Sequence, residues 1–112
     1  MSASLPQFML LIYEREVPAS ASAASPTVLE AHLHLRRQTA ETGGRIVSGH
    51  ALRPPSTGVT IRDNALGEVS PPAPALAGYF IVEASDLDHA VWIGRMVPVH
   101  EGWIEVRPVL TA

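Results

Sequence analysis

Hydrophobic residues fall into short runs separated by polar and turn-forming segments. Residues 7–13 (QFMLLIY) form the longest run, bounded by Pro6 and by charges, which is typical of a strand buried on both faces in the middle of a sheet. Residues 78–83 (GYFIVE) predict another buried strand, and the alternation in residues 103–107 (WIEVR) before Pro108 predicts a last one.

Two shorter β-branched runs, residues 45–51 and 59–62, flank a segment rich in proline and glycine, residues 54–58. Such a segment favours a turn. We therefore expect a strand, a turn and a returning strand. Residues 18–26 and 70–74, which are rich in alanine, serine or proline, predict loops.

A first helix is predicted over residues 26–42. Ser25 before Pro26 is typical of a helix start, and Gly43-Gly44 of a left-handed stop. At about 100° per residue, His32 lies near the middle of one broad apolar side and His34 points away from it. The apolar residues on that side are Val28, Leu29, Leu33, Leu35 and Ala40.

Ser85 and Asp88, three residues apart, resemble a capping box that opens a second helix, and Pro98 ends it. We expect this helix to bury Leu87, Ala90, Val91 and Gly94. The elements follow the order βαββαβ, which predicts an α+β fold with an antiparallel sheet and two helices on one face. The other face of the sheet needs a cover, and a second copy of the chain supplies one, so we expect a homodimer.

Composition narrows the class of protein. With 112 residues, 46% of them hydrophobic, the chain predicts a single domain over residues 1–112. No apolar run reaches the roughly eighteen residues of a membrane span, and no signal peptide is visible, so we expect a soluble, cytoplasmic protein without a membrane partner. The net charge of −3, without basic clusters, argues against nucleic acid as a partner.

Residue types that are missing exclude further chemistry. The chain has no cysteine, which excludes disulfides, thiolate metal sites and cysteine nucleophiles. All eight basic residues are arginines, so no lysine can form a Schiff base, whereas arginines can bind carboxylates in bidentate fashion. We expect no cofactor, because Gly43-Gly44 ends a helix rather than opening one as a phosphate loop does.

Several motifs, taken together and in order, resemble the DGPF-domain branch of the YCII-related family. The similar segments are residues 8–13 (FMLLIY), 49–55 (GHALRPP), 78–83 with 86–90 (DLDHA), and 104–109 (IEVRPV). The resemblance implies a ferredoxin-like fold that dimerises as an α+β barrel, related in fold to muconolactone isomerase, with no settled reaction. It also implies an extracytoplasmic-function sigma factor as a protein partner.

Two positions depart from the family pattern. The segment that names the branch is reduced to residues 70–74 (SPPAP), and His50 stands where glutamate is frequent. Residues 31–33 (AHL) are similar to the family's smaller members, in which the helix histidine is a proposed active-site residue paired with an acidic group. Glu41 lies nine residues further on, roughly on the opposite side of the helix, so it is not assigned as that group.

The candidate catalytic residues are His32 and His50. A helix histidine that faces the sheet can exchange protons near neutral pH, and the alternative for His32 is a half-buried histidine bonded to the backbone. His50 ends a strand beside Arg53, a candidate carboxylate ligand, and the alternative for both is a solvated loop edge. Tyr13 and Tyr79 are candidate ligand-binding residues, or core residues with a satisfied hydroxyl.

Arg107 belongs to a family-like motif, and its role stays open between the site and the dimer. We expect no metal site. His32 and His34 diverge on a helix, and His89 and His100 have no second histidine at ligand spacing.

Two functions remain open. One is a small enzyme that binds a small polar or carboxylate-bearing molecule in a helix–sheet cleft and uses a histidine for acid–base catalysis. The other is a non-catalytic ligand-binding or regulatory module. Retention of His32 favours the enzyme, and loss of the D-G-P-F segment favours the module.

Overall fold

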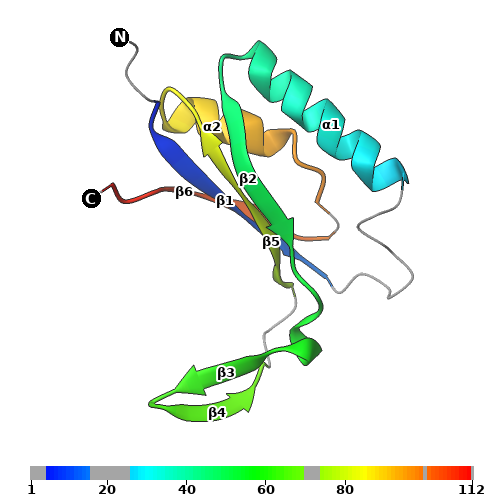
Figure 1. The fold of residues 1–112 in the computed structure, drawn as a ribbon, viewed down its shortest axis with the longest axis vertical. Helices are drawn as coiled ribbons and strands as arrows, with labels where there is room; N and C mark the ends of the chain where they lie inside the picture. Colours follow the sequence, from blue (N-terminus) through cyan, green and yellow to red (C-terminus); the bar gives the residue numbers. More distant parts are fainter. Residues whose placement is uncertain (1–4, 16–25, 70–73, 100, 112) are drawn as a thin grey trace.

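The computed structural model describes residues 5–15, 26–69, 74–99 and 101–111. Four strands form one antiparallel sheet in the order β2-β5-β1-β6 (Figure 1). Two further strands form a separate hairpin, and two α-helices and a short 3-10 helix complete the fold. In chain order the elements are β1 (Gln7–Glu14), α1 (Pro26–Glu41), β2 (Arg45–Ala51), η1 (Pro55–Thr57), β3 (Val59–Arg62), β4 (Ala65–Glu68), β5 (Ala75–Glu83), α2 (Leu87–Arg95) and β6 (Trp103–Pro108).

The core lies on one face of the sheet. In β1 every second residue is buried, because successive side chains of a strand point to opposite faces. Leu35 of α1 and Ala90 and Ile93 of α2 join the same cluster of buried residues, so both helices cover this face. The strand residues of the cluster are Phe8, Leu10, Ile12, Ile46, Phe80 and Val82. The predicted α+β class with an antiparallel sheet and two helices is confirmed.

The opposite face carries no helix in the described part of the chain, and we call it the uncovered face. Its middle is formed by the half-buried side chains Met9, Leu11, Tyr79 and Ile81. β1 does lie in the middle of the sheet, as predicted, but within one chain it is buried on one face only.

The first helix has the predicted extent, but its buried side differs from the prediction. Gly43 takes a φ of 86°, the left-handed stop that its position predicts. Leu35 and Thr39, one turn apart, face the core, whereas Leu33 is 57% exposed. Leu33 lies about 160° around the helix from Leu35, so the two cannot share one contact line. Ala40 is exposed as well, and Ser25 and the side chains of Val28 and Leu29 lie outside the described residues.

The second helix starts one residue later than the capping-box prediction. Its N-cap is Asp86, whose side chain accepts a hydrogen bond from the backbone N–H of His89, so Ser85 is not the cap. Ala90 and Gly94 are buried as predicted. Leu87 is exposed although it lies on the same side of the helix as Gly94, seven residues further on, and Val91 is half-buried, so the prediction is wrong for Leu87.

His89 links the ends of the two helices. Its Nδ1 accepts the Ser85 backbone N–H at 2.9 Å, and its Nε2 lies 2.8 Å from the hydroxyl of Thr42. That hydroxyl already donates to the carbonyl of Thr39, at 2.7 Å, so it accepts from His89. These contacts assign the neutral tautomer with its proton on Nε2. The Thr42–His89–Ser85 network thereby joins the end of α1 to the start of α2.

The run 59–62 does not return to 45–51, so the predicted strand pairing is wrong there. β2 pairs with β5, while β3 pairs with β4, a strand that the sequence reading missed. The reason is the two-residue loop Asp63-Asn64, whose φ values of 49° and 68° are those of a tight hairpin turn. The hairpin projects away from the sheet (Figure 1), and all its strand residues are exposed.

We expect Thr42→Val to destabilise the protein by about 1 kcal/mol, because it leaves the half-buried Nε2–H of His89 without an acceptor. Urea unfolding followed by circular dichroism measures the loss. Thr57→Val is the matched control, since Thr57 also donates to a carbonyl three residues back at 2.7 Å but is exposed and outside this network. Equal losses in the two variants would show that the network adds nothing.

Candidate functional site

The sheet separates the two candidate histidines. The ring of His32, on α1, lies 5.5 Å from that of Phe80, whose side chain belongs to the covered face. His50 of β2 is the register partner of Tyr79, the residue before Phe80, and therefore lies on the uncovered face. Within one chain, His32 and His50 do not share a site.

A β-bulge determines which face His50 occupies. Ile46 pairs with Val82 on the covered face, and Ser48 pairs with Ile81 on the uncovered one, so Val47 is one residue extra in β2. In a regular strand Ile46 and His50, four residues apart, would point to the same side. The bulge reverses this and carries His50 to the uncovered face.

His50 and Tyr79 form the best-defined polar contact of that face. Nδ1 of His50 lies 2.9 Å from the Tyr79 hydroxyl, and the ring centroids are 5.8 Å apart. Two glycines allow β2 and β5 to approach here. A Cβ on Gly78 would lie 2.8 Å from the His50 carbonyl oxygen, and one on Gly49 would overlap the Phe80 ring.

The hydrogen bond fixes one nitrogen of His50 and leaves the other available. Either the hydroxyl of Tyr79 donates to Nδ1, or Nδ1–H donates to the tyrosine oxygen. Among the described residues, none is hydrogen-bonded to Nε2, and the side chain is exposed. A bound molecule can therefore reach a histidine nitrogen whose ring is held from the other side.

The strand registers extend this pair into a row across the uncovered face. His50 pairs with Tyr79, Tyr79 with Leu11, and Leu11 with Glu105 on the opposite edge strand. Glu105 was missed as a candidate, although the alternation in 103–107 places it on the same side as Trp103. Its carboxylate is three strands away from His50, about 14 Å at the usual strand spacing, so it does not contact the histidine in one chain.

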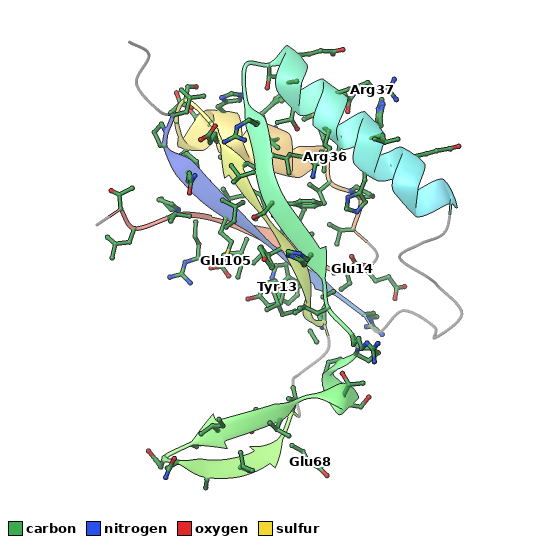
Figure 2. All side chains as sticks on the ribbon, in the orientation of Figure 1. Tyr13, Glu14, Arg36, Arg37, Glu68 and Glu105 are labelled. Atoms are coloured by element: carbon green, nitrogen blue, oxygen red, sulfur yellow. The ribbon has the colours of Figure 1, made fainter. Side chains whose placement is uncertain are left out.

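Tyr13 lies on the same face, one pair along β1 from this row. Its ring stacks on that of Trp103 at 5.5 Å between centroids. Figure 2 shows Tyr13 and Glu105 close together on the neighbouring strands β1 and β6. The stacked pair forms an aromatic surface at the end of the row rather than a hydroxyl aimed at His50.

Three arginines lie beside the row without forming part of it. Arg53 follows His50 by three residues in an exposed segment. Arg107 makes an exposed ion pair with Glu105 at 3.4 Å. Arg45 donates to Glu83 at 2.9 Å, at one corner of the sheet. The hydrogen bond from Arg45, aided by its charge and opposed by partial burial, lowers the pKa of Glu83, and it raises the pKa of Arg45.

In the described ranges, no three histidine or carboxylate side chains gather in a way that could hold a metal ion. None of the helices described there is long and apolar enough to cross a membrane. No protein-family model matches the chain, and no curated protein matches it.

The Arg45–Glu83 pair predicts a pH-dependent contribution to stability. Because the folded-state pKa of Glu83 is lowered from the ordinary 4.5, the contribution is complete above that value and is lost as the pH falls through the lower folded-state pKa. We expect the free energy of unfolding to fall less steeply at acid pH in Glu83→Gln than in the wild-type protein, measured by urea unfolding between pH 3 and 7. Glu68→Gln, on the separate hairpin, is the control, and an equally reduced slope there would contradict the assignment.

Proposed function

We propose that this chain is a homodimeric small-molecule-binding protein of the ferredoxin-like class, which uses the His50–Tyr79 pair to transfer protons to and from a carboxylate-bearing ligand. The observation that carries the proposal is the 2.9 Å contact between two hydrogen-bonding, titratable side chains on an exposed face. The reaction class is isomerisation or hydrolysis, in which a proton moves at carbon or water.

The fold part of the proposal is supported by the sheet. The order β2-β5-β1-β6, with antiparallel neighbours and two helices on one face, is the arrangement expected of a split βαβ fold. The proposed relation to the YCII-related family rests on the motifs in residues 49–55 and 104–109.

A dimer is supported by the apolar middle of the uncovered face. Met9, Leu11 and Ile81 are half-buried side chains that no helix of the described chain covers. Two such faces pack about 10 Å apart in sheet sandwiches, which would remove these side chains from water. The same packing would enclose His50 and Tyr79 and exclude bulk solvent from the pair.

The pair suits His50 as a general base. When Nδ1–H donates to the Tyr79 oxygen, the lone pair of Nε2 faces the ligand and can accept its proton. The resulting imidazolium keeps the same hydrogen bond, because both nitrogens are then donors. Tyr79 therefore orients the ring in both states, and Arg53 supplies the guanidinium for a carboxylate. We assign no role at this site to His32, which lies on the other face.

A non-catalytic ligand-binding or regulatory module is the second candidate. The observation that favours it is the placement of Glu105, whose carboxylate is three strands from His50 in the row. A histidine base is commonly oriented by a carboxylate, whereas among the described residues the His50 ring is hydrogen-bonded to the tyrosine. On the family resemblance alone, the partner proposed for such a module is an extracytoplasmic-function sigma factor.

We expect a small carboxylate to shift the NMR resonances of the His50 ring and to bind about tenfold more weakly to His50→Gln. The lost interaction is the charge-assisted hydrogen bond that Nε2–H donates to the carboxylate when Tyr79 donates to Nδ1 or when the ring is protonated. Tyr79→Phe should weaken binding less, because Nε2 is retained. His34→Gln, an exposed helix histidine, is the matched control. Turnover of the bound compound would distinguish the enzyme from the non-catalytic module. Binding that is lost in His32→Ala but kept in His50→Gln would refute the proposed site at His50.

We expect the wild-type protein to sediment as a dimer at about 50 μM. The Leu11→Glu variant should sediment as a monomer with an unchanged circular dichroism spectrum, because dimerisation would bury the new charge between two sheets. Leu33→Glu, on the exposed side of α1, should remain dimeric. A monomeric wild-type protein, or a dimer that tolerates the Leu11 substitution, would exclude this interface.

A further inference from the structure

The β3–β4 hairpin has an apolar side that nothing in the described chain covers. Its strands contact each other and make only isolated contacts with other described elements. The register places Val59, Ile61, Leu66 and Glu68 on one side, and Thr60, Arg62, Ala65 and Gly67 on the other. Val59, Ile61 and Leu66 are 67%, 70% and 74% exposed.

A hairpin of this kind does not hold its shape alone. An isolated two-stranded hairpin is marginally stable in water, and a third strand or a packed face is needed to stabilise it. The loop adds to the cost, because Asp63 and Asn64 are both non-glycine residues at positive φ. The large apolar side chains all lie on one side, which is the pattern of strands that pack against another surface.

The place where the hairpin leaves the sheet connects it to the uncovered face. It is inserted between β2 and β5, the strands that carry His50 and Tyr79. At its base, Leu76 is the register partner of Tyr13 and therefore lies on the uncovered face, and Leu52 is bonded through its N–H to Ala77. Both leucines are exposed, so apolar side chains lie at the end of the sheet from which the hairpin leaves.

We propose that the β3–β4 hairpin is an arm that packs Val59, Ile61 and Leu66 against a second copy of this chain. The inference rests on the homodimer of the proposed function. In a two-fold symmetric dimer each protomer contributes one arm and contacts the arm of its partner, so the same apolar contact forms twice in each dimer.

The area that a stable dimer needs favours this occupant. Four strands of about eight residues give the sheet face a flat outline of roughly 500 Å². One arm of two four-residue strands adds about 130 Å². An arm given and an arm received enlarge this outline by about half, a gain in contact area for each protomer that only a second copy of the chain supplies on both sides.

The test compares substitutions on the two sides of the arm. Ile61→Thr with Leu66→Thr removes the apolar side, and Arg62→Thr with Ala65→Thr changes the adjacent register pair on the other side. Threonine keeps the strand propensity in both. Sedimentation equilibrium should give a dimer Kd at least tenfold higher for the first variant and within about threefold of wild type for the second.

Crosslinking gives a readout that does not depend on affinity. The chain has no cysteine, so Leu66→Cys and Ala65→Cys can each carry a single benzophenone maleimide. Illumination should produce a covalent dimer mainly from position 66. If the first double variant dimerises like wild type and position 66 does not crosslink, the arm is wrong while the dimer stands. A monomeric wild-type protein overturns arm and dimer together, and the His50 titration still tests the ligand site.

Discussion

Leu10 and Val82, on adjacent strands, meet Ile93 of α2 in a core that lies entirely on one side of the sheet, and the remaining structure depends on this one-sided packing. Because the two helices cover a single face, the alternation of every strand divides its residues into a helix-facing set and a free set. The free set contains both apolar and titratable groups. The face without helices is therefore where a ligand or a second chain has access.

The candidate site on that face is built from backbone features more than from its polar side chains. Close approach of β2 and β5 needs Gly49 and Gly78, and the bulge at Val47 selects the side on which His50 emerges. The histidine and the tyrosine are then register partners, so their contact follows from the strand pairing. On the other face, His32 packs its ring near Phe80 and has no part in this arrangement.

Much of the fold could be read from the sequence. The apolar runs and the helix signals at Pro26 and Gly43 predict elements close to those observed, because these signals are local. Strand pairing is not local, so residues 59–62 could not be distinguished from a strand of the main sheet. The turn residues Asp63 and Asn64 were the available signal for a separate hairpin. His50 and Tyr79 were both candidates, but their contact depends on a register and a bulge that composition does not encode.

The bulge has a consequence for comparing related chains. Three residues separate Ile46, which faces the helices, from His50, which does not, and the face of the histidine depends on whether the strand between them is regular. A single-residue deletion at this point would remove the bulge, leave every motif in place and keep the histidine on the face without helices, because residues three apart in a regular strand point to opposite sides. An alignment with a gap at the bulge would therefore equate histidines on the same side of the sheet, whereas a chain with the same spacing and no bulge would carry its histidine on the helix side. The spacing between isoleucine and histidine, taken together with the presence of the bulge, is thus a better guide to a shared site than the presence of the histidine itself.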